Sequence, residues 1–347
     1  MRFYQKQHPF YCGIDLHAKT LYVCIVAHDG EILVHRRIPA RPDAFLKLVR
    51  PYREGLAVGV ECMFSWYWLA DLCREHEIDF VLGHALYMKA IHGGKVKNDK
   101  IDAEKIAMLL RAGMMPIAYV YPKEMRATRD LLRRRCYLVG IRARALSHIQ
   151  NTNTQYNLAD LAKRITYAAN REGLAEHFPE GSTRRMIELD LALVDQLDDE
   201  IRRLELYLTR TAKIDAPHDY YRLQSIPGVG KILSMVLLYE IHDIRRFPKV
   251  GNFLSYARLV RCSHESAGKR CGFGNRKIGN AHLRWACSEA AFVMTRESDE
   301  VKQFLARKEK KHGKPKAIAI LNAKLGRAIY YILKRKEPFD PKRFFTT

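Results

Sequence analysis

The sequence lacks closely spaced cysteine pairs, long apolar runs and an apolar signal core at its N-terminus. Its eight cysteines include no CxxC pair, and most lie within apolar segments such as 21–27, as reduced core thiols of cytosolic proteins do. No stretch approaches the ~20 apolar residues that a membrane-spanning helix needs. We therefore expect a soluble, cytoplasmic protein without a disulfide framework and with no membrane partner.

Acidic residues are scarce relative to basic ones. The chain of 347 residues has 38 Asp and Glu against 60 Lys and Arg, which gives a formal net charge of +22. Such an excess repels itself and usually persists because a polyanion neutralises it, so nucleic acid is favoured as the partner over a merely solvated basic surface. With 48% hydrophobic residues, the chain is long enough for two or three domains with cores of their own.

Residues 1–122 alternate strand and helix signals, which predicts an α/β domain with a mixed sheet. The dipeptide Asp29-Gly30 between two apolar runs is a hairpin signal. Strands are predicted at 11–15, 21–27, 31–37, 56–61 and 79–83, and helices at 42–49, 66–75 and 99–112.

The rest of the chain favours helices. Residues 123–211 carry many charges and leucines at three- and four-residue steps, which fits a coiled-coil arm or an ordinary helical bundle equally well. Residues 212–336 are rich in helix signals and glycine-containing turns, and 337–347 form a short tail. The predicted fold class is thus α/β plus α, with a helical middle and a mainly helical C-terminal domain.

Four carboxylates occur where predicted elements begin or end. Asp15 and Glu61 end strands of one sheet, whereas Asp99 and Asp102 share one face at the start of a helix. Clustered carboxylates need a cation, and hard oxygen ligands suit Mg²⁺ or Mn²⁺. The plainer alternatives are that Asp15 is a turn residue and that Asp99 caps the helix beginning near Lys100.

Two basic segments in residues 212–336 are candidate nucleic-acid contacts. Residues 226–231 have the pattern of the turn in a helix-hairpin-helix element. In such a turn, Gly228 and Gly230 would let backbone N–H groups approach a phosphate beside Lys231. A helix-capping turn without a ligand is the alternative. A second, glycine-containing run fits a loop along a phosphate backbone and would contribute Arg261, Lys269, Arg270, Arg276, Lys277 and Arg284.

Six segments together resemble the DEDD transposases of the insertion-sequence one-ten family, relatives of the Piv-type DNA invertases. The first three are GIDLHAKTLYVCIV, GVECMFSWYW and KNDKIDAEKIAMLLRAG. The others are IPGVGKILSMVLLYEIHDIRRF, LVRCSHESAGKR and KIGNAHLRWACSEAAF, in the same order as in that family. The resemblance covers nearly the whole chain, and two departures are His17, where small residues are more usual, and Ala267, where glycine is frequent.

The resemblance implies an RNase H-like (RuvC-like) fold for residues 1–122 and a catalytic, metal-binding quartet of Asp15, Glu61, Asp99 and Asp102. It also implies that Ser266, within HESAGK, is a catalytic serine that forms a covalent phosphoserine with DNA. Without the resemblance, Ser266 would be one serine among many, with Ser263 as the nearest rival. The general base stays unassigned, although His264 and Glu265 are adjacent.

The resemblance further implies donor DNA, target DNA and an element-encoded guide (bridge) RNA as partners, in a bacterial or archaeal cell. Strand exchange needs several active sites, so a homodimer that assembles into a tetramer is expected. One alternative function is a metal-dependent, structure-specific nuclease of the Holliday-junction type, with water as the nucleophile. Another is a non-catalytic nucleic-acid-binding protein, against which the presence of all four carboxylates and Ser266 argues.

Overall fold

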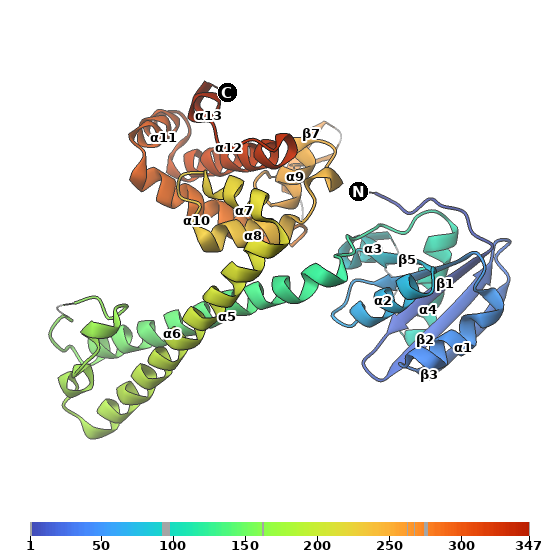
Figure 1. The fold of residues 1–347 in the computed structure, drawn as a ribbon, viewed down its shortest axis with the longest axis horizontal. Helices are drawn as coiled ribbons and strands as arrows, with labels where there is room; N and C mark the ends of the chain where they lie inside the picture. The colour runs from blue at the N-terminus through green and yellow to red at the C-terminus, as the bar shows by residue number, and fades with distance from the viewer. Residues whose placement is uncertain are drawn as a thin grey trace. The chain divides into compact units, whose positions relative to one another are not determined.

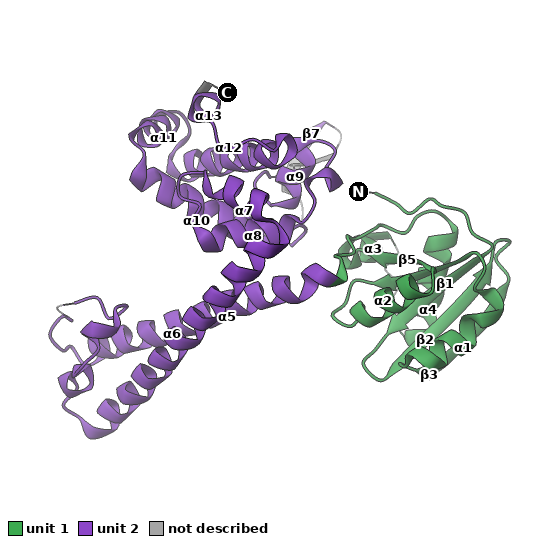
Figure 2. Ribbon diagram, in the orientation of Figure 1, with its two compact units in different colours: residues 1–123 green, residues 124–347 purple. Residues whose placement is uncertain are grey.

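The structure, a computed structural model, describes residues 2–91, 98–161, 163–261, 263–266, 268–273 and 277–346. It has two compact units, Met1–Lys123 and Glu124–Thr347 (Figure 2). The predicted limits at 211 and 336 within the second unit stay predictions.

A five-stranded mixed sheet forms the centre of the first unit, with the strand order β3-β2-β1-β4-β5 (Figure 1). Strands β1, β2 and β3 are antiparallel neighbours, whereas β1, β4 and β5 run parallel. The predicted mixed sheet is confirmed. Its strands are β1 (Phe10–Leu16), β2 (Thr20–Ala27), β3 (Ile32–Pro39), β4 (Leu56–Glu61) and β5 (Asp79–Gly83). The helices of this unit are α1 (Pro42–Val49), η1 (Arg50–Tyr52), α2 (Tyr67–Glu75), α3 (Ala85–Ile91) and α4 (Asp99–Arg111).

Both faces of this sheet are covered, because alternate residues of each strand point to opposite sides. On one face, Ile14 and its neighbours pack with Phe45 of α1 and Leu69 of α2. On the other face, α4 packs directly onto β1. A Cβ atom on Gly13 would lie 2.1 Å from the backbone oxygen of Ala103, so only glycine permits this approach. The close packing fixes the start of α4 relative to the end of β1.

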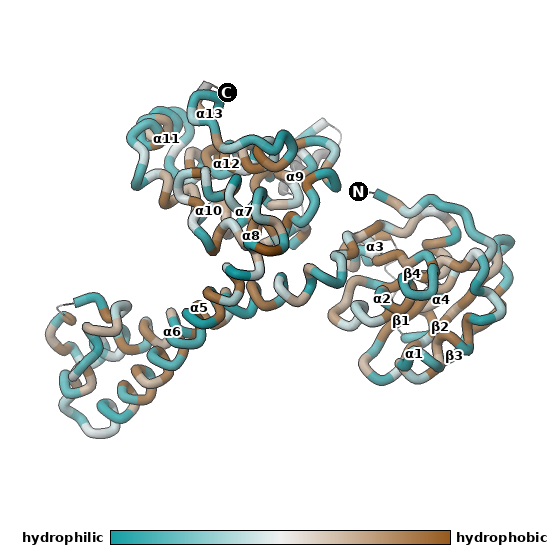
Figure 3. Tube along the Cα trace, viewed as in Figure 1, coloured by the Kyte–Doolittle hydropathy of each residue, from teal (hydrophilic) through white to brown (hydrophobic). Residues whose placement is uncertain are grey.

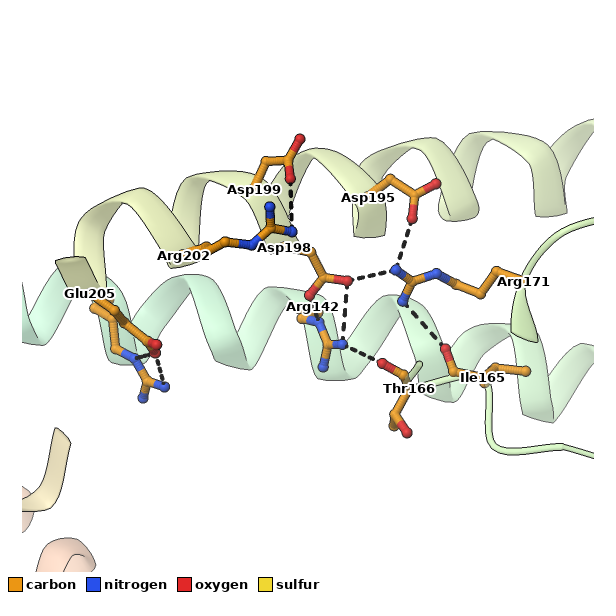
Figure 4. Close-up of polar contacts among 10 residues, drawn as sticks. Arg142, Ile165, Thr166, Arg171, Asp195, Asp198, Asp199, Arg202 and Glu205 are labelled. Atoms are coloured by element: carbon orange, nitrogen blue, oxygen red, sulfur yellow. Dashed lines mark hydrogen bonds and ion pairs between the residues drawn. The ribbon is translucent and has the colours of Figure 1, made fainter. Parts of the chain in front are cut away.

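The second unit begins with two long helices, α5 (Lys123–Gln155) and α6 (Gly181–Asp215). Ile149 and Val194 belong to one small apolar core between them. Beside this core, Asp198 accepts hydrogen bonds from Arg142 and from Arg171, the latter at 2.6 Å (Figure 4). Two short 3-10 helices, η2 (Ala168–Asn170) and η3 (Leu174–His177), lie in the connection between α5 and α6.

A mainly helical bundle follows, which confirms the predicted helical character of the C-terminal region. Its centre is α8, whose residues from Ser234 to Ile241 are all buried. Figure 3 shows this hydrophobic helix and the hydrophobic strands of the first unit. The helices are α7 (Pro217–Gln224), α8 (Lys231–Ile241), η4 (Ile244–Arg246), α9 (Val250–Tyr256), α10 (Ala281–Glu297), α11 (Asp299–His312), α12 (Lys314–Arg335) and α13 (Pro341–Thr346).

A two-stranded hairpin interrupts these helices, between α9 and α10. Its strands are β6 (Ser263–Ser266) and β7 (Lys269–Phe273), and the sequence pattern did not predict them. Among the described residues, no helix combines the length and the apolar character required to cross a membrane.

Candidate functional site

The parallel pairing of β1 and β4 places two of the four predicted carboxylates at one edge of the sheet. Ile14 of β1 is aligned with Val60 of β4. Asp15 and Glu61 are the next residues along the two strands, so they follow this aligned pair side by side. The expectation that both lie at the same sheet edge therefore agrees with the observed register.

The other two carboxylates lie in the first turn of α4. The helix is capped by Asn98, whose side chain accepts a hydrogen bond from the backbone N–H of Ile101 at 2.8 Å. The alternative that Asp99 is the cap is therefore wrong, because the cap position is one residue earlier. Asp99 is free of that role, and Asp102 lies three residues further along the same turn.

Asp15 and Asp99 meet in one cluster with His17. The Nε2 atom of His17 lies 3.2 Å from Oδ2 of Asp15 and 3.5 Å from Oδ1 of Asp99. One ligand atom from each of the three residues lies within 4.8 Å of the others. Arg37 donates a hydrogen bond of 2.6 Å to the second oxygen of Asp99. His17 and Arg37 were not predicted as site residues. The signal for His17 was its spacing, because alternate residues of an extended segment share one side.

Electrostatics in this cluster favour a bound cation. Burial raises the pKa of Asp15, and the charges of Asp99 and Asp102 raise it further, whereas His17 opposes the shift. Two carboxylates and an imidazole are donors that divalent ions accept, so the residues fit a metal ion. In the part of the chain that the structure describes, Glu61 and Asp102 are outside the compact set of ligand atoms.

Ser266 ends strand β6 at the tip of the hairpin. It pairs in register with Lys269, the first residue of β7, across a turn that contains Gly268. Gly268 has a φ of 72°, a left-handed conformation that glycine adopts without strain. Ala267 and Arg276 lie outside the described residues. The side chains of the other predicted contacts that are exposed belong to Lys231, Arg261, Lys269, Lys277 and Arg284.

The segment that follows the hairpin is tied to the end of α9. Arg258, with a φ of 56°, donates hydrogen bonds to the backbone oxygens of Lys277 and of Ile278, the latter at 3.1 Å. The backbone N–H of Asn280 donates to the oxygen of Tyr256 at 2.6 Å. These contacts join the chain just before β6 to the chain just after β7, so they fix the base of the hairpin.

A buried ion-pair network anchors Asn280 in turn. Its side chain accepts from two N–H groups of α10 and donates to Glu240 at 2.7 Å. Glu240 is 3% exposed and also accepts hydrogen bonds from Arg129 and Arg133, at 3.0 and 2.6 Å. Burial alone would raise the pKa of Glu240, but Arg133 and Arg129 outweigh it and the pKa is lowered.

Replacing Glu240 with Ala is expected to destabilise the protein by about 3–5 kcal/mol, because two arginines lose their buried partner. The lowered pKa also makes this loss depend on pH. The stability that ionised Glu240 contributes is complete at pH values above the ordinary pKa of a glutamate, and it is lost as the pH falls through the folded-state pKa. Denaturant unfolding near neutral and at acid pH measures both effects. The control is Glu205→Ala, which removes a 33%-exposed partner of Arg135 and is expected to cost about 1 kcal/mol or less. Equal losses in the two variants would contradict this account.

The turn between α7 and α8 uses its two glycines differently. Gly228 has a φ of 78°, and a Cβ atom there would lie 2.5 Å from the backbone oxygen of Ala290 in α10, so packing accounts for this glycine. At Gly230, an added Cβ would have no described atom within 4 Å, so packing does not account for this glycine. Beside it is a groove of about 970 Å³ that is also lined by Lys231 and by Arg210 of α6.

Comparisons with known proteins agree with the two halves of the sequence resemblance. Residues 12–158 match the model of the DEDD transposase of IS110, and residues 220–306 match that of the Transposase IS116/IS110/IS902 family. The chain is 24% identical to the transposase for insertion sequence element IS1111A of Coxiella burnetii, over 94% of this chain and 90% of that protein. It is 23% identical to y4qE of Sinorhizobium fredii, a transposase by its name, over 58% of this chain and 49% of that protein.

Proposed function

The chain belongs to the DEDD transposases of the IS116/IS110/IS902 family, and from this premise we propose that it cuts and rejoins DNA through a covalent phosphoserine at Ser266. The observation that carries the proposal is the meeting of Asp15 and Asp99 at the end of β1. The family's DEDD motif supplies these residues, and the mixed sheet supports the RNase H-like fold that the resemblance implies.

Asp15 and Asp99 would hold a divalent ion, Mg²⁺ or Mn²⁺, with Glu61 and Asp102 completing the site. When bound, this ion supplies charge that polarises the scissile phosphate. Asp15 is suited to this role because burial and neighbouring carboxylates destabilise its anionic form, and a cation relieves that cost. Close packing of α4 on β1 holds Asp15 and Asp99 in place before DNA arrives.

Ser266 would attack the DNA phosphate with its hydroxyl oxygen. A new bond forms between that oxygen and phosphorus, and the bond from phosphorus to one DNA oxygen breaks. The serine proton passes to a base that stays unassigned, and the departing DNA oxygen takes up a proton to become a hydroxyl. The released DNA hydroxyl then attacks a phosphoserine and restores the free serine, so rejoining needs no external energy source. The exposed Lys269, in register with Ser266, would offset the charge that develops on the phosphate.

The partners proposed are donor DNA, target DNA and an element-encoded bridge RNA, bound by a homodimer that assembles into a tetramer. The net charge of +22 supports polyanion binding but does not distinguish DNA from RNA. Purified protein, the RNA transcribed from the flank of its gene, and both DNAs in Mg²⁺ are expected to yield strand-exchanged product. Cleaved DNA without any joined product would instead favour the metal-dependent nuclease.

DNA binding is expected to weaken steeply with salt, because each phosphate contact releases condensed counterions. In a plot of log affinity against log salt, the slope is expected to become less negative by about 0.9 for each phosphate contact that is removed. Lys231→Ala tests this at the start of α8, where the lysine is exposed. Fluorescence anisotropy with duplex DNA gives the slopes. The control is Lys302→Ala, because Lys302 already pairs with Asp299 at 2.7 Å. A flat salt response would overturn the electrostatic part of the proposal.

A further inference from the structure

His17 occupies a fixed position beside the two clustered carboxylates. It follows the last residue of β1, and its backbone N–H donates to the oxygen of Thr20 at 3.0 Å, which closes the turn into β2. Its Nε2 atom faces both Asp15, at 3.2 Å, and Asp99, at 3.5 Å. The nitrogen, rather than a carbon edge of the ring, is therefore directed at the carboxylate oxygens.

These separations match those between adjacent ligands of one ion. Octahedral coordination at 2.0–2.1 Å places neighbouring ligand atoms about 3 Å apart. The observed separations of 3.2 and 3.5 Å from the histidine nitrogen are close to that value. His17 is also half-exposed, with 53% of its side chain accessible, so solvent and metal ions reach it.

The alternative role for His17 is that of a counter-ion which merely separates the two acids. Asp99 already has a cationic partner, because Arg37 donates to its Oδ2 at 2.6 Å. His17 approaches the other oxygen of Asp99, Oδ1, at 3.5 Å. The two partners thus contact different oxygens: Arg37 neutralises Asp99 at Oδ2, and His17 lies between Oδ1 of Asp99 and Oδ2 of Asp15.

We propose that His17 is a direct ligand of the divalent ion at the Asp15–Asp99 site and that it makes this site favour Mn²⁺ over Mg²⁺. The inference rests on the proposed metal site and adds a ligand outside the predicted quartet. Mg²⁺ prefers oxygen ligands and keeps much of its water, whereas a neutral imidazole is a good ligand for transition metals. A mixed nitrogen and oxygen donor set therefore discriminates between the two ions.

The test is titration of the full-length protein with Mn²⁺ and, separately, with Mg²⁺, by calorimetry at one fixed pH. His17→Ala is expected to lower the affinity for Mn²⁺ by about tenfold or more, which is 1.4 kcal/mol per factor of ten. Its affinity for Mg²⁺ is expected to change much less. Electron paramagnetic resonance of bound Mn²⁺ is expected to show coupling to a ¹⁴N nucleus that is lost in His17→Ala.

A matched control is His35→Ala. His35 is a nearby histidine whose Nε2 lies 3.9 Å from Glu104, outside the ligand cluster. If His17 is only a counter-ion, its removal leaves Mn²⁺ affinity unchanged or raises it, which would overturn the inference. Asp15→Asn distinguishes failure of the proposed metal site from failure of the His17 inference. If Asp15→Asn abolishes Mn²⁺ binding but His17→Ala binds Mn²⁺ as tightly as wild type, the metal site stands and the His17 inference fails. If wild type binds no Mn²⁺, both fail.

Discussion

Replacing Ser266 with Ala is expected to abolish the covalent protein–DNA adduct and to lower strand exchange by roughly 10⁴-fold or more. The reason is that alanine lacks the oxygen that would bond to phosphorus. Metal binding at Asp15 and Asp99 is expected to persist, because these residues belong to the other compact unit. End-labelled donor DNA, trapped with Mg²⁺ and resolved under denaturing conditions, measures the adduct.

The control for this variant is Ser263→Ala, which removes a serine from the same strand. Ser263 starts β6 and pairs with Phe273, whereas Ser266 is at the turn of the hairpin. The Ser263 variant is expected to form the adduct at close to the wild-type level. If Ser266→Ala still cuts and Ser263→Ala does not, the nucleophile is misassigned. If both variants cut as well as wild type, water attack at the metal site replaces the proposed mechanism.

Replacing Asp15 with Asn is expected to abolish both metal binding and adduct formation while leaving the fold intact. Burial and the charges of Asp99 and Asp102 raise the pKa of Asp15, so ionising this carboxyl costs more free energy in the folded state than in the unfolded state. The neutral amide of the variant removes that cost. At pH values above the ordinary pKa of an aspartate, the variant is therefore expected to be as stable as wild type or more stable. Calorimetry measures Mn²⁺ binding, thermal unfolding measures stability, and the adduct assay measures activity. Together they show whether function is lost without loss of stability.

The control for Asp15→Asn is Asp43→Asn, on the outside of α1. Asp43 is 72% exposed and its ion pair with Arg41 spans 3.3 Å, so neither metal binding nor stability is expected to change measurably. Retained adduct formation by Asp15→Asn would contradict the proposed site. Loss of activity together with a large fall in thermal stability would show instead that Asp15 is a structural residue.

The sheet of the first unit was predictable because local signals agree with one another. The runs LAVGVE and DFVLG are short and mostly apolar, and they form β4 and β5 with the predicted bounds. The hairpin β6–β7 could not be predicted in this way. Its sequences, SHES and KRCGF, lack the regular apolar alternation that identifies a half-buried strand.

The candidate site was predictable only in part, for a similar reason. The ends of β1 and β4 could be placed at one edge because parallel neighbours align their termini. The meeting of Asp99 with Asp15 depends on α4 packing against Gly13, a tertiary contact that no local pattern encodes. The contact between Arg37 and Asp99 has the same origin, since it joins β3 to α4 across 62 residues of sequence.

The central claim is that DNA becomes linked to Ser266, and mapping the linkage tests it most directly. Protein trapped on donor DNA in Mg²⁺ would be digested with nuclease and protease, and the nucleotide-bearing peptide sequenced by mass spectrometry. The account predicts a single modified peptide, one that contains Ser266, with the phosphate on the oxygen of that serine. Modification of another residue, or cleaved DNA with no modified peptide at all, would contradict it.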